Sequence, residues 1–421
     1  MDAEGRSRSG RNVARGLRPG QPDRRPRAGS RDGDQAAPGS GGRAAGRGGR
    51  PQGRSAIAAT APVTPSLDFF FLNDGGQTAD VVAQRIATFL NGATKSLDIA
   101  IYDLRLAAAP GATVLGAFQA AVTRGVHVRL MFNQDHPADL QVPPPAEIDW
   151  AFVDQLKSFG VETKPIPGVP DLMHHKYVVR DAGTPSAAVL TGSANWTNDS
   201  WTREENVIFT IASPDVAATY TQNFEELWQN PVVADSGRIS STWESLADST
   251  HVQIYFCPGR GLKLVHAMAR SIASAQQRIR ICSPVLTSGP VLGTLAEVVD
   301  HGKVDVAGVY DATQMDQVQR QWGGQATASW KIAAFHGIVA AVRFGSKRST
   351  PYAVGSVHDF MHAKILVADD YVYAGSFNLS HSGEQNAENV VQIESHAVAE
   401  LCTAYIDHVA ARYGGRPLVG S

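Results

Sequence analysis

Two copies of one short pattern of histidine, lysine and aspartate carry the chemistry that this sequence could perform. Each copy reads H-x-K-x4-D, and the copies are His174, Lys176 and Asp181 in the first half of the chain and His362, Lys364 and Asp369 in the second. One such pattern is expected by chance in about two of every hundred chains of this composition, so a second copy indicates function. Imidazoles can attack phosphorus or transfer protons, and ammonium groups can stabilise phosphate oxygens. The pattern therefore predicts cleavage of a phosphodiester.

The same polar residues follow each copy. They are Gly192, Ser193, Ala194 and Asn195, then Glu205 and Asn206, in the first half, and Gly375, Ser376, Phe377 and Asn378, then Glu388 and Asn389, in the second. Small glycines permit close backbone approach, and Ser and Asn add neutral hydrogen-bond donors. The residues that we expect to bind phosphate are Lys176, Lys364, Asn195 and Asn378, supported by Ser193, Ser376, Glu205 and Glu388. Either glutamate could hold the second ring nitrogen of a histidine and raise its basicity.

Two such units facing each other would place two His, two Lys and two Asn around one phosphate. One imidazole would attack phosphorus, and the other would protonate the leaving alkoxide and then deprotonate the incoming water or alcohol. The lysines and asparagines would stabilise the charge that develops on the non-bridging oxygens. Outside these motifs no cluster has the spacing of metal ligands, so we predict neither a catalytic metal nor another cofactor.

Strand geometry explains the spacing inside each motif. Residues two apart on a strand project from one face, so His174 and Lys176 can point the same way beside the apolar strand Tyr177–Val179. Asp181 falls where this strand turns, and there it can accept hydrogen bonds that fix the bend. A second strand, Ala187–Thr191, would return Gly-Ser-x-Asn beside the first. The second half repeats this arrangement.

The elements around the motifs read as a duplicated α/β unit. In the first half, apolar strands at 67–72, 96–102 and 126–132 alternate with helices, and the same order recurs roughly 180 residues later. Apolar runs separated by helices predict a largely parallel sheet that is covered on both faces. We place the join between the two units near Ser236–Ser249.

Composition separates a tail from the body. Residues 1–65 hold thirteen Arg, no Lys and five acidic residues, a formal charge of +8, with almost no large apolar residue, so we predict a disordered tail. The remaining residues carry −10, which gives no general attraction to nucleic acid. The predicted organisation is a disordered tail at 1–65, a first domain at 66–240 and a second domain at 250–421.

The sequence contains no recognisable membrane segment. No apolar run approaches the ~20 residues of a spanning helix, and the basic N-terminus lacks the apolar core of a secretory signal. We expect a cytoplasmic protein that meets a membrane peripherally, with secretion left open should the true start of the chain differ.

The two intact H-x-K-x4-D motifs resemble those of the phospholipase D superfamily, and the resemblance covers residues 67–421. It implies an α/β fold in which two similar α-β-α sandwich halves, each with a mainly parallel mixed sheet, meet at a pseudo-twofold active site. It also implies a covalent phosphohistidine intermediate, with His174 as the nucleophile and His362 as the acid/base. Spacing and composition alone leave that order open.

The leading functional hypothesis is hydrolysis of the headgroup phosphodiester of a phospholipid at a membrane surface. Because both motifs lie in one chain, a monomer would suffice and no protein partner would be required. The alternative is a metal-independent nuclease acting on nucleic acid. It is favoured by the Arg-rich tail and by Gly192–Thr197 (GSANWT), which resembles the motif ending of small bacterial nucleases and of the mitochondrial cardiolipin hydrolase. A third hypothesis, a non-enzymatic scaffold, is disfavoured by the intact His, Lys and Asn.

Several residues near the motifs are interpreted more simply. His175 adjoins the motif, but only the register from His174 satisfies both Lys176 and Asp181, so no direct role is expected for it. Trp196, Trp201 and Phe377 are expected to serve packing, the alternative being that they bracket a lipid headgroup or stack on a base. The segments Asp135–Asp149 and Asp311–Ser329 are expected to be loops that frame the entrance and set specificity.

Overall fold

A computed structural model describes residues 66–136, 148–342, 344–353 and 355–415, which belong to one compact unit. The tail predicted at 1–65 and most of the loop predicted at 135–149 lie outside the described residues. Among the residues that are described, no helix is both long enough and apolar enough to cross a membrane.

The first sheet carries the first motif. Its strand order is β1-β9-β7-β6-β2-β4-β5. These strands are β1 (Leu67–Leu72), β2 (Ser96–Ile101), β4 (His127–Asn133), β5 (Glu162–Ile166), β6 (Lys176–Arg180), β7 (Ala188–Gly192) and β9 (Asn206–Ala212). β6 and β9 run antiparallel to their neighbours, whereas β2, β4 and β5 are parallel. Most strands therefore share one direction in a mixed sheet.

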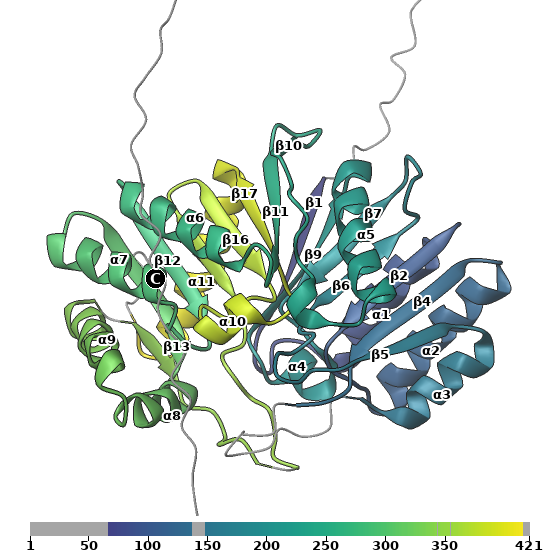
Figure 1. Cartoon of the computed structure of the whole chain (residues 1–421), viewed down its shortest axis with the longest axis horizontal. Coiled ribbons are helices and arrows are strands. Elements are labelled where there is room, and N and C mark those ends of the chain that lie inside the picture. Colours follow the sequence, from purple (N-terminus) through teal and green to yellow (C-terminus); the bar gives the residue numbers. More distant parts are fainter. Residues whose placement is uncertain (1–65, 137–147, 343, 354, 416–421) are drawn as a thin grey trace, which may run out of the picture. The chain divides into compact units, whose positions relative to one another are not determined.

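The second sheet repeats this plan around the second motif. Its order is β10-β11-β17-β16-β15-β12-β13-β14, with β10, β15 and β17 reversed. These strands are β10 (Glu244–Ser245), β11 (His251–Cys257), β12 (Arg278–Ser283), β13 (Asp305–Asp311), β14 (Gly345–Lys347), β15 (Ile365–Ala368), β16 (Tyr371–Gly375) and β17 (Glu388–Glu394). The fold class predicted from the sequence, a duplicated α/β sandwich, is confirmed (Figure 1).

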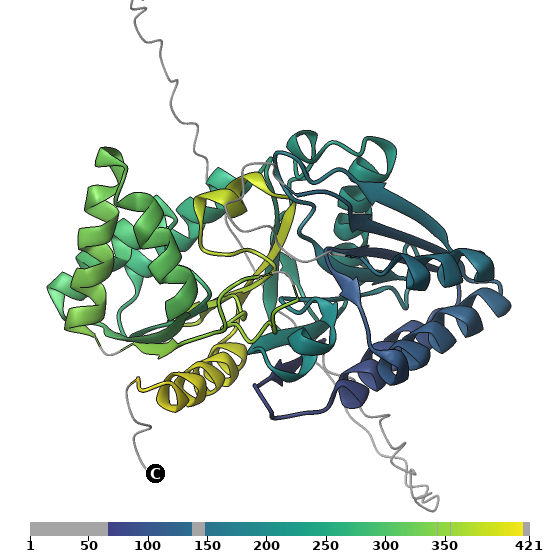
Figure 2. The ribbon, with the colours of Figure 1, turned by 90° about the horizontal axis from the view of Figure 1, so that it is seen from below.

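Helices cover both faces of each sheet, as Figure 2 shows from below. Val178 and Leu190 pack with the helices on one face of the first sheet, while Val179 and Val189 pack with α5 on the other, because side chains alternate along a strand. The helices are α1 (Ala79–Asn91), α2 (Ala108–Thr123), α3 (Trp150–Phe159) and α5 (Pro214–Gln229) in the first half, and α6 (Gly261–Ser274), α7 (Gly289–His301), α8 (Ala312–Trp322), α9 (Ser329–Ala341) and α11 (His396–Arg412) in the second. Shorter elements are β3 (Leu104–Arg105), β8 (Trp196–Thr197), α4 (Asn198–Thr202), α10 (His381–Gln385) and two 3-10 turns, Val233–Asp235 and Ala326–Ala328.

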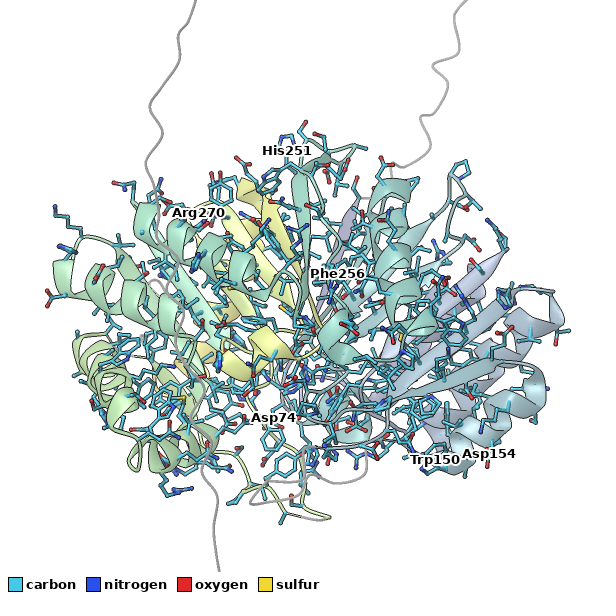
Figure 3. All side chains as sticks on the ribbon, in the orientation of Figure 1. Asp74, Trp150, Asp154, His251, Phe256 and Arg270 are labelled. Atoms are coloured by element: carbon cyan, nitrogen blue, oxygen red, sulfur yellow. The ribbon has the colours of Figure 1, made fainter. Side chains whose placement is uncertain are left out.

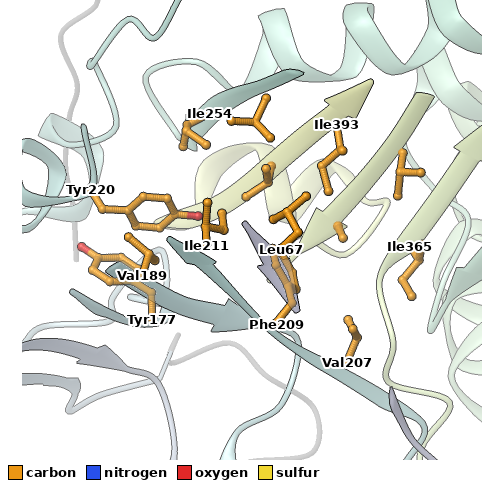
Figure 4. Close-up of a cluster of buried hydrophobic side chains, with 14 of the residues drawn as sticks. Leu67, Tyr177, Val189, Val207, Phe209, Ile211, Tyr220, Ile254, Ile365 and Ile393 are labelled. Atoms are coloured by element: carbon orange, nitrogen blue, oxygen red, sulfur yellow. The ribbon is translucent and has the colours of Figure 1, made fainter. Parts of the chain in front are cut away.

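One hydrophobic core joins the two halves. Figure 4 shows Leu67, Phe209 and Ile211 of the first sheet in the same cluster as Ile254 and Ile393 of the second. Burial of apolar surface is the main favourable term in folding, so this shared core holds the sheets together. The two motifs are thereby positioned by a single packed interior.

The motif aspartates close turns at the far end of the motif strands. Asp181 has a positive φ of 55°, and its carboxylate accepts hydrogen bonds from the backbone N–H groups of Thr94, Lys95 and Ser96 at 2.7–3.2 Å. Asp369, with φ 49°, binds the backbone before β12 in the same way. Burial raises the pKa of both carboxyls, but the N–H donors outweigh it and hold the pKa below its usual value.

The segment predicted as a loop at Asp311–Ser329 is mostly helical, so that prediction is wrong. Asp311 caps α8 by accepting a hydrogen bond from the backbone N–H of Gln314 at 3.0 Å. Along α8 only Ala312 and Met315 are buried, so the helix lacks a wide apolar stripe, and its polar sequence hid it.

We predict that Asp181→Ala lowers the free energy of unfolding by about 3 kcal/mol, because it removes several charge-assisted hydrogen bonds and places Ala at a positive φ. Asp181→Asn should cost clearly less, because Asn tolerates this conformation and keeps one acceptor oxygen. Urea unfolding followed by circular dichroism measures both. Equal, small losses for the two variants would contradict this role of Asp181.

Candidate active site

The residues predicted to carry chemistry in the two halves meet at one pocket. His174 and Asn195 from the first half and His362 and Asn378 from the second line a pocket of about 290 Å³. Tyr102, Asp103 and Glu204 line it as well, as do residues of α8. An outer pocket of about 530 Å³ shares Thr313, Gln317, Gln321, Ser349 and Tyr352 with it and adds Asp316, Arg320 and Arg348.

Each histidine is fixed through its backbone to the opposite half of the chain. The His174 N–H donates to the carbonyl of Ala387 at 2.9 Å, and the His362 N–H donates to the carbonyl of Glu205 at 3.1 Å. Isolated parallel bridges join Met173 to Ala387 and Glu205 to Met361 at the same places. The two motifs are therefore locked together where the halves meet.

A carboxylate from the second half holds the His174 ring. Nδ1 of His174 lies 2.9 Å from the Glu388 carboxylate, and the Ser376 hydroxyl donates to that carboxylate at 2.5 Å. Glu388 is fully buried. The contact predicted for Glu388 is present, and it leaves Nε2 of His174 available for chemistry.

The His362 ring is held differently, and the contact predicted for Glu205 is wrong. Nδ1 of His362 lies 3.1 Å from the Asn206 amide oxygen and 3.3 Å from the Glu204 carboxylate. The Glu205 carboxylate turns away to Lys347, at 2.7 Å, and to the Tyr413 hydroxyl, and it supports His362 through its backbone carbonyl instead.

A one-residue shift between the halves explains this error. The motif serines fix the alignment, because Ser193 accepts a hydrogen bond from the Val207 N–H and Ser376 accepts one from the Asn389 N–H, each at 3.0 Å. Asn206 therefore corresponds to Glu388, although both halves read Glu-Asn in sequence. Glu204, missed in the sequence, supplies the carboxylate near His362.

Two buried lysines flank the histidines. The ammonium groups of Lys176 and Lys364 each donate to the backbone carbonyl of the motif histidine in their own half. Burial lowers the pKa of Lys176 to about 7 and also lowers that of Lys364, which is further reduced by repulsion from Lys176. Nearby carboxylates, Glu388 and Glu204, oppose these shifts, and a bound phosphate would add further negative charge beside both ammonium groups.

Burial also keeps the imidazoles neutral. It lowers the pKa of His174 to about 4 even though Glu388 opposes the shift, and it lowers the pKa of His362 well below 6.5, helped by Lys364. Burial raises the pKa of Glu204 to about 7. Neutral His174 is the form that can act as a nucleophile.

The asparagines and glycines of the second motif element complete the pocket. The side chains of Asn195 and Asn378 line the pocket, and their amide NH2 groups are donors of the kind that a phosphate oxygen accepts. A Cβ at Gly192 would lie 2.0 Å from the carbonyl oxygen of Val207, and one at Gly375 would lie 2.1 Å from that of Asn389. Both glycines are therefore required for the close approach of the strands.

The remaining predicted residues lie in supporting places. Asp181 and Asp369 close turns away from the pocket and so position the motif strands. Ser193 donates to the Asn206 side chain at 2.7 Å, as Ser376 does to Glu388. Trp196, Trp201 and Phe377 are buried in the hydrophobic cores, as expected. Tyr102 and Asp103, which line the pocket directly after β2, belong to no motif, and the sequence carried no signal for them.

No group of three or more His, Cys, Asp or Glu side chains arranged to hold a metal ion occurs among the described residues.

The family to which the chain belongs follows from comparison with known sequences. A family model described as cardiolipin synthase, PLD-like domain, matches residues 86–228 and again residues 268–410. Each match contains one H-x-K-x4-D motif. The chain is a member of this family, in the phospholipase D superfamily, and carries its domain twice.

Individual relatives agree with this assignment. The mitochondrial cardiolipin hydrolase of Xenopus tropicalis is 32% identical over 151 residues, which is 36% of this chain and 62% of the relative. That of Chlamydomonas reinhardtii is 23% identical over 144 residues, 34% of this chain and 56% of the relative. The chain thus spans less than two thirds of the length of either relative.

Solved structures share the fold across both halves. Phosphatidylserine synthase of Haemophilus influenzae superposes with a TM-score of 0.57 at 13% identity, over 84% of this chain and 87% of that one. Polyphosphate kinase of Porphyromonas gingivalis gives 0.50 at 12% identity, over 81% of this chain and 46% of that one. The paired arrangement of two sandwich halves is therefore a shared architecture.

His175 is buried beside the pocket, and its lowered pKa makes the stability of the fold depend on pH. Its Nδ1 lies 3.3 Å from the Asn389 amide oxygen, and burial lowers its pKa to about 3. Between pH 6.5 and that value the unfolded chain carries a proton that the folded protein lacks, so acid destabilises the fold. We predict that lowering the pH from 6.5 to 5.0 costs the full chain about 1.5 kcal/mol more than it costs His175→Gln. Urea midpoints at the two pH values measure this difference, and identical pH dependence in both proteins would refute it.

Proposed function

We propose that this chain is a phosphodiesterase that hydrolyses the headgroup phosphodiester of a phospholipid through a phosphohistidine intermediate. The observation that carries the proposal is the convergence of two imidazoles, two buried ammonium groups and two asparagine side chains at one pocket. The two lysines supply positive charge without a metal ion, and the ring contacts of both histidines leave Nε2 free.

The unequal ring partners support His174 as the nucleophile. An imidazole that forms a bond to phosphorus becomes cationic, and a carboxylate on its Nδ1–H stabilises that cation. His174 has the Glu388 carboxylate at 2.9 Å, whereas the nearest partner of His362 is the neutral amide of Asn206 at 3.1 Å. The acid/base role therefore falls to His362.

The reaction proceeds in two displacements. In the first, Nε2 of His174 bonds to phosphorus as the bond from phosphorus to the headgroup oxygen breaks, and protonated His362 gives its proton to that oxygen. The anionic phosphodiester favours this protonated state, because it adds negative charge beside a buried ring. In the second, His362 takes a proton from water, whose oxygen attacks phosphorus and releases His174. Lys176 and Lys364 stabilise the non-bridging oxygens throughout.

The outer pocket supports a hydrophilic leaving group. Its lining includes Asp316, Arg320 and Arg348 together with Gln317 and Gln321, which suit a polar headgroup and not acyl chains. The relatives named for cardiolipin hydrolysis support a phospholipid substrate. A cytoplasmic monomer that meets the membrane peripherally remains part of the proposal.

The test is headgroup release from vesicles of phosphatidylcholine and, separately, cardiolipin, with EDTA present. The full chain should release headgroup, because its lysines supply the positive charge, and His174→Ala should reduce release at least a thousandfold, because it removes the nucleophile. Phosphorus NMR of the lipid products measures both rates.

Lys157→Gln serves as the control, since Lys157 is exposed and pairs with Asp154 away from the pocket. It should release headgroup at the full rate. Folded protein that leaves both lipids intact but degrades single-stranded DNA in EDTA, in a manner that depends on His174, would replace this proposal with the nuclease alternative.

A further inference from the structure

A polar groove in the second half is separate from the catalytic pocket. It has a volume of about 350 Å³, lies between α6, β11 and residues 239–241, and shares no lining residue with the pocket of the histidines. Figure 3 labels Arg270, one of the residues that line this groove. The groove therefore plays no part in the mechanism described above.

Four basic side chains line this groove. They are Arg260, Lys263, His266 and Arg270, and no acidic residue lines the groove with them. Lys263, His266 and Arg270 are spaced by three and four residues on α6, so they lie on one face of the helix. Neutral hydroxyl groups of Ser240, Ser241 and Tyr255 line the opposite wall and floor.

The charges in the groove are not neutralised by the protein. Neither Lys263 nor Arg270 forms an ion pair with another residue in the described ranges. Other exposed arginines do, such as Arg203 with Asp199 and Arg348 with Asp316. Like charges three or four residues apart on a helix destabilise it slightly, so the cluster does not serve the stability of α6.

The duplication of the fold supplies an internal comparison. The corresponding groove of the first half lies between α1 and β1 and has a volume of about 670 Å³. The third, sixth and tenth residues of α1 are Val81, Gln84 and Thr88, and the same positions of α6 are Lys263, His266 and Arg270. The first-half groove is lined by Arg85 and Arg180 instead, and Arg85 is paired with Asp68, so the sandwich forms this groove without basic residues at the three helix positions.

The strands that form the floors of the two grooves, β1 and β11, also differ, and again the second half carries the more polar residue. Leu72 pairs with Asn206 and Cys257 pairs with Glu388, so β1 and β11 correspond, and Phe70 of β1 takes the place of Tyr255 of β11. The floor of the first-half groove is therefore apolar at the position where the floor of the second-half groove carries a hydroxyl group. The Tyr255 hydroxyl bonds to the side chains of Gln253 and Gln392, whereas the charges of Lys263 and Arg270 have no ion-pair partner among the described residues, so a ligand would account for the charges.

We propose that this groove binds a phosphate-bearing molecule at a site distinct from the catalytic pocket. Two guanidinium groups and one ammonium group match the oxygens of a phosphate, and the Ser240 hydroxyl adds a neutral donor. The body of the protein carries −10, so an anion is drawn to this local positive charge and repelled by most of the surface. The volume suits a small ligand with one or two phosphoryl groups.

The experiment is calorimetric titration of the full chain with pyrophosphate at low ionic strength. Two binding events are expected, one at the groove and one at the catalytic pocket. Lys263→Gln combined with Arg270→Gln should abolish the first event or weaken it at least tenfold, and Lys176→Gln should abolish the second. Hydrolysis of bis(p-nitrophenyl) phosphate by the groove variant should stay unchanged, which separates this inference from the proposed reaction.

The charge-matched control is Lys157→Gln combined with Lys303→Gln, which removes two exposed charges elsewhere. A parallel arm measures sedimentation with phosphatidic acid vesicles, because a phosphate monoester can also arrive as a lipid headgroup. A loss for the groove variant in the pyrophosphate arm identifies a soluble ligand, and a loss confined to the vesicle arm identifies a lipid. If the groove variant loses affinity in neither arm, or no more than the control does, the groove is not a binding site.

Discussion

Each motif histidine of this protein is held by the half of the chain that does not carry it. The backbone of His174 bonds to Ala387 and its ring to Glu388, while the backbone of His362 bonds to Glu205 and its ring to Asn206 and Glu204. These bonds are buried, where hydrogen bonds are strong and losing one is costly. Neither half can therefore orient its own histidine, and the shared core that joins the sheets is a condition for the site.

The same burial sets the electrostatics of the empty pocket. Two ammonium groups and two imidazoles lie together with little access to water, and burial lowers the pKa of all four. A group that is costly to charge in the empty protein is charged more easily beside an anion. The site thus favours a phosphodiester over a neutral ligand. The two halves differ in their ring partners, because the Glu388 carboxylate lies 2.9 Å from the His174 ring, whereas the Asn206 amide at 3.1 Å and the Glu204 carboxylate at 3.3 Å lie beside the His362 ring.

Much of this could be predicted from the sequence, because the motifs encode local geometry. The spacing of His174 and Lys176 and the glycines of Gly-Ser-x-Asn act within adjacent strands, where sequence distance and spatial distance agree. The partner of each histidine ring is set across the interface instead, where one extra residue before Asn206 changes which side chain faces His362. Helix α8 was not predicted for another reason. One of its faces borders the pocket and needs no apolar residues, so its sequence shows no apolar stripe. The basic groove could not be predicted, because it depends on how α6 packs beside β11 and on which face of α6 carries its basic residues.

The central claim is that one histidine becomes covalently attached to phosphorus while the other moves protons. Bis(p-nitrophenyl) phosphate tests it directly, because its leaving group departs without an acid. His362→Ala should release one equivalent of nitrophenolate in a burst and then stall, and mass spectrometry of the peptide containing His174 should show a nitrophenyl-phosphoryl adduct. His174→Ala should give neither burst nor adduct. A burst in His174→Ala with the adduct on His362 would reverse the assigned roles, and the absence of any adduct in both variants would contradict covalent catalysis at this pocket.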